Sequence, residues 1–226
     1  MTITTAEFPR LQIEYPESDG KPMAETDIHI RELTNTRATL ADFFREASDV
    51  YVSGNLLLYY EEGNPAASVS PDVFVVKGVP KGERRTYRVW VEKRPPLVVF
   101  EFTSRSTRLE DSGNKKALYA MLGVREYFVC DPLGEYLEPP LQGFVLERGE
   151  YRRLPAESDG SVMSDELELR LKLEGNQLRL CVAATGERLL TPAEAQEKAR
   201  EAEQKLAQAQ EEIERLKAEL ARLRDE

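Results

Sequence analysis

The fold is decided by residues 97–104, which read LVVFEFTS. An apolar run this continuous is typical of a strand that is buried on both faces at the centre of a sheet. One acid, Glu101, interrupts the run, and a carboxylate is costly to bury without a partner. We therefore expect Glu101 to meet a cation or strong hydrogen bonds inside the fold.

Two further apolar runs and a helical pattern flank this strand. Upstream, Asp72 stands directly before the run VFVV of residues 73–76. Downstream, residues 111–122 have a helical pattern that Gly123 is expected to end, and residues 126–130 form another apolar run. A strand, a helix and a strand in this order predict a crossover between parallel strands. The sequence therefore predicts an α/β fold with a mixed sheet flanked by helices.

The remaining elements are predicted from periodicity and turn residues. A helix is expected from about residue 27 to residue 47, with Asp27 as its N-cap. Residues 49–52 and 56–60 are expected to form a hairpin through Ser53-Gly54-Asn55. The other expected strands are a return strand at residues 87–91 and a meander added to the edge of the sheet at residues 141–147, 151–154, 167–173 and 178–182.

Composition excludes several classes of protein. The chain of 226 residues has 31 Lys and Arg against 41 Asp and Glu, a net charge of −10, so nucleic acid can be bound only through a local basic patch. Cys130 and Cys181 lie in apolar runs and are expected to be reduced thiols, and one histidine, His29, is too few for a zinc site. Because no apolar run approaches 18 residues, we expect a cytoplasmic protein without a membrane segment.

Asp72, Glu101 and Lys115 together have the chemistry of a metal-dependent phosphodiesterase. Such a site needs carboxylates for a divalent ion and a cation for the charge that develops on the phosphoryl group. Each residue also has a simpler interpretation: Asp72 could cap a turn, Glu101 could pair with a structural arginine, and Lys115 could be a surface residue. Their order on a strand start, a central strand and the next helix favours the site.

These positions belong to a longer set of motifs in a fixed order. The set comprises residues 71–72, 101–107, 111–115, 119, 123–128 and 131–132. With this set the sequence resembles the Uma-two type of "putative restriction endonucleases", a branch of the PD-(D/E)xK nuclease superfamily. The resemblance extends to residues 25–29 and 185–192 and covers most of residues 23–192.

The resemblance implies a restriction-endonuclease-like core with helices on both sides of the sheet. It implies Mg²⁺ or Mn²⁺ held by Asp72 and Glu101, with the backbone carbonyl of Phe102 completing the ligand shell. The superfamily lysine would fall at Thr103, which carries no charge. In this family the lysine is displaced to the following helix, where the matching residue is Lys115.

Two further residues near these motifs, Lys116 and Glu25, need separate assignments. Lys116 lies about 100° further round the helix, so it and Lys115 cannot both face the site. Glu25 is a candidate additional acid, although a structural role for Glu25, or capping of the helix by Asp27, explains this stretch equally well.

Two basic segments could contact the substrate. Residues 77–94 carry seven cations and two acids, a net charge of +5, and are either a grip for a phosphate backbone or a solvated hairpin. Arg105 and Arg108, which directly follow the Glu101 strand, are better placed to meet a scissile phosphate. No element that reads bases is apparent in the sequence.

From Thr191 the chain changes to a heptad pattern. Thr191 is expected to cap a helix that Pro192 begins. The a positions are Ala199, Leu206, Ile213 and Leu220, and the d positions are Ala202, Ala209, Leu216 and Leu223. In a parallel pair of helices, three of four contacts from g (Lys198, Lys205, Glu212, Glu219) to e (Glu203, Gln210, Lys217, Arg224) join opposite charges. This favours a self-associating coiled coil over a helix folded back on its own domain.

The sequence thus predicts a metal-dependent endonuclease that cleaves phosphodiester bonds in DNA and pairs into a homodimer. Its expected parts are an N-terminal arm at 1–22, a restriction-endonuclease-like domain at 23–190 and a coiled-coil helix at 191–226. The acidic net charge and the neutral Thr103 favour an alternative. In that alternative the chain is a catalytically inactive nuclease-fold protein that binds DNA, or a coiled-coil interaction protein.

Overall fold

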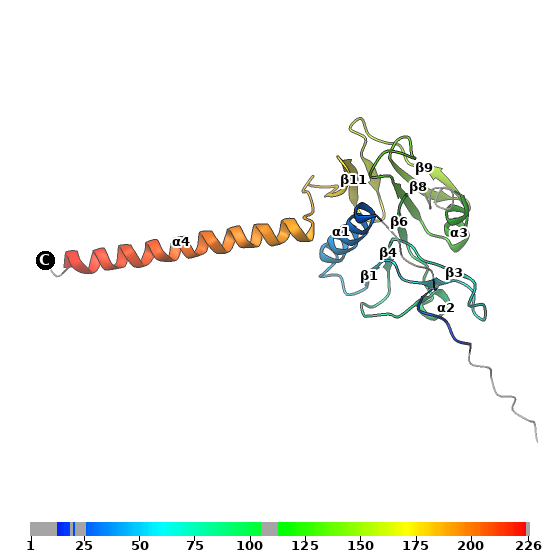
Figure 1. The fold of residues 1–226 in the computed structure, drawn as a ribbon, viewed down its shortest axis with the longest axis horizontal. Helices are drawn as coiled ribbons and strands as arrows, with labels where there is room; N and C mark the ends of the chain where they lie inside the picture. The colour runs from blue at the N-terminus through cyan, green and yellow to red at the C-terminus, as the bar shows by residue number, and fades with distance from the viewer. Residues whose placement is uncertain (1–12, 19, 21–25, 105–112, 225–226) are drawn as a thin grey trace, which may run out of the picture.

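A six-stranded mixed sheet forms the centre of the molecule in the computed structural model, which describes residues 13–18, 20, 26–104 and 113–224 (Figure 1). The strands follow in the order β1 (Val50–Ser53), β4 (Val73–Lys77), β6 (Val98–Phe102), β7 (Glu126–Cys130), β8 (Leu141–Glu147) and β9 (Glu150–Arg153). Strands β6 and β7 are parallel, and the other neighbours are antiparallel. Every residue of β6 is buried, which confirms the predicted central strand.

The connection from β6 to β7 is the predicted crossover. It runs through helix α3 (Lys115–Leu122), which ends at Gly123 in the left-handed conformation with a φ of 81°. The turn from β8 to β9 at Arg148 and Gly149 is also left-handed and closes the predicted hairpin.

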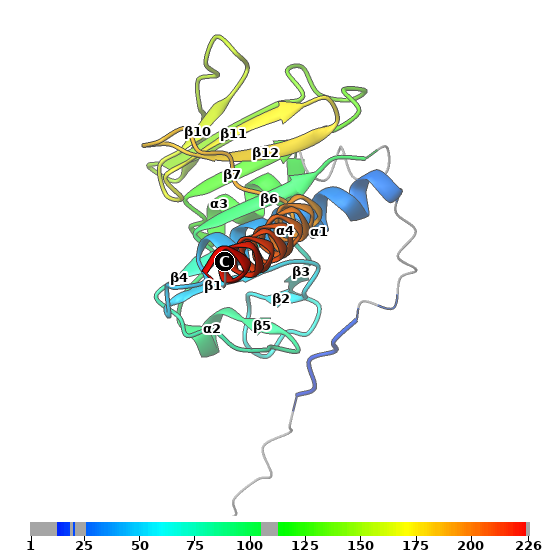
Figure 2. The same ribbon diagram turned by 90° about the vertical axis from the view of Figure 1, so that its left-hand side faces the viewer.

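Both faces of the sheet are covered, because side chains of successive strand residues point to opposite faces. On one face, Val98 and Phe100 pack with helix α1 (Asp27–Phe43) and a second sheet of β10 (Val162–Ser164), β11 (Leu169–Glu174) and β12 (Gln177–Val182). On the other face, Val99 and Tyr127 pack with α3 and a third sheet of β3 (Ser68–Val69), β2 (Leu58–Tyr59) and β5 (Tyr87–Arg88). Figure 2 shows these two small sheets on opposite sides of the molecule. The prediction of a mixed sheet with helices on both sides is confirmed.

The predicted hairpin of residues 49–60 is wrong. Strand β1 pairs with β4, and β2 belongs to the third sheet. The intervening Gly54 and Asn55 lie against the start of β4, where the Asn55 N–H donates to the Pro71 carbonyl at 2.9 Å. The turn residues therefore carry the chain from one sheet to the next instead of reversing it.

Two other strand predictions need correction. Of residues 87–91, only Tyr87–Arg88 is strand, parallel to β2, and Val89–Glu92 forms the short helix α2. Residues 167–182 form the predicted hairpin, but in the separate sheet of β10, β11 and β12. Four leucines of this hairpin pack onto the α1 face of the central sheet: Leu169, Leu171, Leu178 and Leu180. A hairpin added to the edge of the sheet would have left this face uncovered.

The N-cap of α1 differs from the prediction by one residue, and the helix ends at Phe43, short of the predicted residue 47. Thr26, and not Asp27, is the N-cap, since its side-chain oxygen accepts from the His29 N–H at 3.3 Å. Of the predicted N-terminal arm, the described part lies on the third sheet. The Tyr15 ring packs edge-on against Tyr59 and at a tilt against Trp90, with ring centroids 5.1 and 5.2 Å apart.

Helix α4 (Pro192–Arg224) projects away from the rest of the molecule (Figure 1). Its predicted cap is confirmed, because the Glu194 N–H donates to Thr191 Oγ1 and the Thr191 N–H donates to Glu194 Oε2. Helix α4 is long but too polar to span a bilayer, and no other helix in the described ranges is long and apolar enough to do so. Both cysteines are free thiols, Cys130 buried and Cys181 half-buried.

Substituting Gly54 should disturb the start of β4. An alanine Cβ at this position would lie 2.1 Å from the Asp72 carbonyl oxygen, so the backbone must move. We expect Gly54→Ala to lower the free energy of unfolding by about 1–3 kcal/mol in urea denaturation. Gly113→Ala is the matched control, because nothing lies within 4 Å of its added Cβ. Equal stability of the two variants would contradict this role of Gly54.

Candidate active site

The two predicted acids lie on neighbouring strands. The antiparallel register pairs Val73 with Phe100 and Phe74 with Val99, so one further step places Asp72 opposite Glu101. Residues opposite each other in such a pair have Cβ atoms about 4.5–5.5 Å apart. The sheet therefore brings two carboxylates together at one end of β4 and β6, and like charges this close require compensation.

Asp72 is held by two donors from different elements. Its Oδ2 accepts the Phe102 N–H at 2.7 Å, and its Oδ1 lies 3.2 Å from His29 Nε2. The Asp72 side chain is 13% exposed. Because the contacts come from β6 and α1, Asp72 is part of the tertiary structure and does not merely cap a turn.

Glu101 is held by two side chains of α3. Its Oε2 accepts from Lys115 Nζ at 2.8 Å, and its Oε1 accepts from the Tyr119 hydroxyl at 2.6 Å. The Glu101 side chain is 1% exposed, whereas Lys115 is 17% exposed. Burial and the neighbouring Glu101 raise the pKa of Tyr119 well above its ordinary value, so Tyr119 remains a hydrogen-bond donor. The cation that Glu101 was expected to meet is thus Lys115.

Lys116 points elsewhere, as helix geometry predicts. Its ammonium lies 3.4 Å from the centroid of the Phe144 ring. Burial, and then the charge of Arg153, lower the pKa of Lys116. The two adjacent lysines therefore have different environments, and only Lys115 contacts the candidate site in the described contacts.

His29 and Tyr119 were not selected as site residues from the sequence. Both lay within the motifs that carry the family resemblance, which was one available signal. A second signal was spacing, because Tyr119 is four residues after Lys115 and so lies on the same helix face. The partner of each residue becomes visible only in three dimensions.

Two further buried acids, Glu126 and Asp131, are bound as structural groups. Glu126 accepts from the Ser164 hydroxyl and from the N–H groups of Asp165 and Glu166. Burial raises the pKa of Glu126 more than these donors lower it. Asp131 accepts from the N–H groups of Gly134, Tyr136 and Leu137 and so fixes a turn. Neither carboxylate has a lysine beside it in these contacts, which distinguishes both from Glu101.

The basic segment at residues 77–94 is not positioned as a grip beside the acids. It leaves β4 after Lys77 and re-enters β6 at Val98, the ends of these strands that lie furthest from Asp72 and Glu101. Lys81 Nζ donates to the carbonyls of Phe44 and Arg45, both at 2.7 Å. Arg84 is bound to Glu92 at 2.7 Å. Lys81 and Arg84 therefore stabilise the fold. The hairpin that was the alternative prediction for residues 77–94 is absent.

Three of the predicted site residues, Glu25, Arg105 and Arg108, lie outside the described residues. Their roles stay predictions. The same is true of the Phe102 carbonyl as a metal ligand, since the contact that involves Phe102 here is its N–H to Asp72.

The donor set fits a hard divalent cation in kind. Mg²⁺ commonly uses one or two carboxylates together with water and substrate phosphate, and Asp72 and Glu101 supply two. Each of their four oxygens accepts at least one bond from the protein, so a bound ion would share these oxygens with the protein donors. Within the described ranges, no group of three or more His, Cys, Asp or Glu side chains is arranged to hold a metal ion.

A mixed sheet with paired acids at one end and a lysine from the crossover helix defines a nuclease-like α/β protein. The comparisons agree with this class. The family model Uma2, described as "Putative restriction endonuclease", matches residues 4–181. The chain therefore belongs to the Uma2 family.

A solved structure has a similar fold. It is a crystal structure of a "putative nuclease belonging to DUF820" from Anabaena variabilis. The match has a TM-score of 0.51 and 14% identity and covers 69% of this chain and 83% of the other. At this identity the match supports the fold alone. No curated protein matches the chain.

The ion pair of Glu101 and Lys115 can be tested by its coupling energy. We expect Lys115→Met to lower the free energy of unfolding by about 2–3 kcal/mol, because a buried carboxylate loses its cation. In the double variant with Glu101→Gln, much of this loss should disappear, giving a coupling of about 1–2 kcal/mol in denaturant titrations. Lys116→Met is the matched control and should show no coupling to Glu101→Gln.

Proposed function

We propose that the protein is a metal-dependent endonuclease that hydrolyses phosphodiester bonds in DNA. The observation that carries the proposal is the register that sets Asp72 opposite Glu101, with Lys115 bound to Glu101 at 2.8 Å. All three residues lie within the part of the chain that matches the family model.

Asp72 and Glu101 are the proposed ligands of Mg²⁺ or Mn²⁺. When bound, such an ion polarises a phosphoryl oxygen and lowers the pKa of a water molecule. Asp72 is the more accessible of the two carboxylates, with 13% of its side chain exposed. Substrate would therefore approach from the Asp72 side of the pair.

Lys115 is the proposed electrostatic catalyst. The Lys115 side chain is 17% exposed, and its ammonium adjoins the buried Glu101, so one side of the ammonium faces the protein. A fixed positive charge in a partly dry site stabilises the negative charge that develops on the phosphoryl oxygens. Because the charge is held in place before the substrate binds, little reorganisation is needed during the reaction.

His29 and Tyr119 are proposed positioning residues. Tyr119 is fully buried and donates to Glu101 Oε1 at 2.6 Å, which fixes the rotamer of this carboxylate. His29 lies 3.2 Å from Asp72 Oδ1 and fixes the other carboxylate from the opposite face of the sheet. Together they hold the two proposed ligands in one relative orientation.

Binding of DNA has to overcome a net charge of −10. We propose that Lys115, with Arg105 and Arg108 in the segment between β6 and α3, supplies the local positive charge. We also propose that two chains pair into a homodimer through a coiled coil of residues 191–226. In this proposal the coiled coil is separate from the nuclease-like domain at 23–190 and from the N-terminal arm at 1–22.

One observation favours a second function, a nuclease-fold protein that binds DNA without cleaving it. All four oxygens of Asp72 and Glu101 accept protein donors, as in a site stabilised without a metal. In this alternative Lys115 is a structural partner of Glu101. Metal affinity separates the two functions, because only the endonuclease needs an ion at Asp72.

Cleavage of supercoiled, linear and single-stranded DNA in Mg²⁺ or Mn²⁺ tests the proposal. We expect Asp72→Asn, Glu101→Gln and Lys115→Met each to reduce the rate by at least about 100-fold. Lys116→Met should cleave normally. Calorimetry with Mn²⁺ should show that Asp72→Asn also weakens metal binding, a readout independent of activity.

Three outcomes decide between the candidates. Cleavage that persists unchanged in Lys115→Met would show that the assigned mechanism is wrong. A wild-type protein that cleaves no form of DNA, with Mn²⁺ affinity unaltered by Asp72→Asn, would refute the endonuclease. DNA binding without cleavage or metal binding would establish the second function.

A matched pair of tyrosines tests the positioning role. Tyr119→Phe and Tyr151→Phe each remove one phenolic hydrogen bond, to Glu101 at 2.6 Å and to the Val124 carbonyl at 2.8 Å. Both variants should lose about 1–2 kcal/mol of stability. We expect only Tyr119→Phe to lower kcat for DNA cleavage, by about tenfold, because only it loosens a proposed ligand. Equal kcat values for the two would show that Tyr119 is purely structural.

A further inference from the structure

Helix α4 carries large apolar side chains that pack against nothing in the described structure. Leu206, Ile213, Leu216, Leu220 and Leu223 are 47–64% exposed. All of them occupy a or d positions of the heptad. The helix projects beyond the domain in Figure 1 and points toward the viewer in Figure 2, so it is not folded back on its own chain. A narrow apolar stripe on an otherwise polar helix is typical of a coiled-coil seam.

The first turn of α4 is fixed to the domain. Glu194 binds Arg179 and Arg188, at 3.2 and 3.0 Å, and accepts the Thr191 N–H at 3.0 Å. These bonds lower the pKa of Glu194, the Thr191 contact first. The Thr39 hydroxyl also donates to the Leu190 carbonyl at 3.3 Å. The direction in which the seam leaves the domain is therefore set by the fold.

The charges beside the seam identify a second copy as the occupant. In a parallel pair, Glu212 at g faces Lys217 at e of the partner, and Lys198 faces Glu203. Lys205 faces the neutral Gln210, so none of these contacts is like-charged. In the single chain Lys217 binds Glu214 at 2.8 Å, an exposed pair that contributes little. Lys217 can therefore exchange Glu214 for Glu212 of a partner.

Antiparallel pairing keeps some opposite-charged contacts, such as Lys217 with Glu203, but adds a like-charged contact that the parallel pair lacks. The arrangement that sets Leu206 against Leu216 brings Glu212 against Glu212 of the partner. The arrangement shifted by one heptad sets Leu206 against Leu223 and brings Glu212 near position 219, also an acid. Ile213 at a next to Leu216 at d further favours two strands over three.

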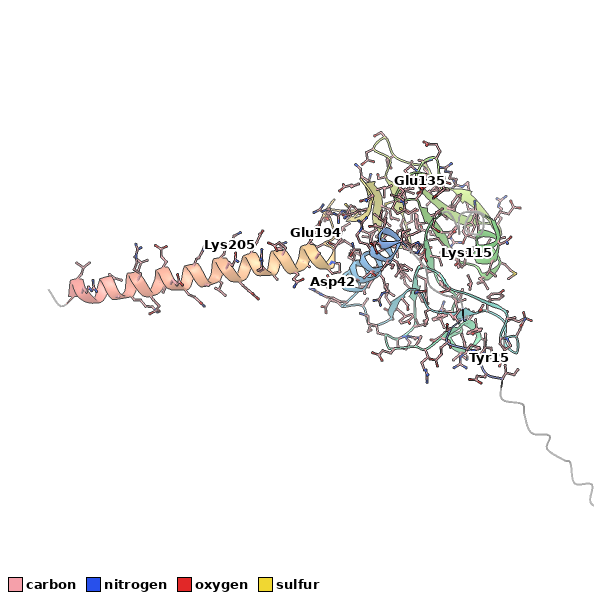
Figure 3. All side chains as sticks on the ribbon, viewed as in Figure 1. Tyr15, Asp42, Lys115, Glu135, Glu194 and Lys205 are labelled. Carbon is pink, nitrogen blue, oxygen red and sulfur yellow. The ribbon has the colours of Figure 1, made fainter. Side chains whose placement is uncertain are left out.

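We propose that two copies pair through α4 as a parallel, in-register, two-stranded coiled coil, with the seam closed from Leu206 to Leu223. This orientation rests on the proposed homodimer. It places both domains at the same end of the coiled coil, so that two candidate sites can reach one duplex. Figure 3 shows Lys115 and Glu194 on opposite sides of the domain, which leaves the Lys115 face clear of the paired helices.

Proximity of introduced thiols tests the orientation. Two variants are made in a Cys181→Ser background, one with Leu206→Cys and one with Leu223→Cys, and Cys130 stays buried. In a parallel pair the two 223 positions are adjacent. In the antiparallel arrangements they lie about 25–36 Å apart. We expect a short bis-maleimide to link 223 to 223 and 206 to 206 in each variant alone, and to give no 206–223 product when the two are mixed.

A charge exchange provides an independent test. Glu212→Lys and Lys217→Glu should each raise the dimer dissociation constant about tenfold, because each creates a like-charged contact in the parallel pair. The double variant should recover wild-type affinity to within about threefold, although it still lacks the Lys217–Glu214 pair. In the antiparallel arrangement with Glu212 against itself, the double variant would not recover, since residue 217 would then meet Glu203.

Sedimentation equilibrium of the full chain separates the possible failures. A dimer that links 223 to 223 supports the proposal. A dimer that links 206 to 223, or a double variant without recovery, overturns the orientation and leaves the homodimer standing. A trimer overturns the two-stranded assignment. A monomer at micromolar concentration overturns both, while DNA cleavage would remain a separate result.

Discussion

The structure depends on holding two carboxylates opposite each other on adjacent strands of one sheet. Asp72 and Glu101 meet because β4 and β6 are antiparallel in the register that pairs Val73 with Phe100. Two like charges in a largely buried position destabilise a fold unless each is bonded to a donor or a cation. The surrounding architecture supplies those partners, and this requirement links the central sheet to the helices on both of its faces.

The partners come from opposite layers of the molecule. Helix α3, on one face, places Lys115 and Tyr119 one turn apart on Glu101. Helix α1, on the other face, places His29 on Asp72. The crossover from β6 to β7 and the packing of α1 with β10–β12 thus orient side chains at the same end of the sheet. An arrangement held from two layers is stiffer than one supported by a single loop.

Local signals in the sequence predicted where the central strands and the crossover helix lie. Which strands pair with each other depends on tertiary structure, and local signals did not predict it. The buried strand around Phe100, the crossover and the stop at Gly123 follow from apolar runs and a left-handed turn, which are local properties. The pairing of β1 with β4 is not local. Gly54 is consistent with a hairpin turn, and only its approach to the Asp72 carbonyl shows that the chain passes between sheets there. Lys115 could be selected as a site residue from a sequence motif. The role of His29 becomes visible only through its contact with Asp72, which lies 43 residues away in the sequence.

Charge counted along the sequence differs from charge available to a ligand. Residues 77–94 sum to +5, yet Lys81 is bonded to backbone carbonyls and Arg84 to Glu92 and to a tyrosine ring, that of Tyr51, at 4.1 Å. A cation strengthens DNA binding by meeting a phosphate and releasing counterions, and cations already bonded inside the fold contribute little to that. In a chain of net charge −10, the positive sum of residues 77–94 therefore overstates the attraction of this segment for a polyanion. Lys115 differs from Lys81 and Arg84, because its bond is to a carboxylate of the candidate site and its side chain is still 17% exposed.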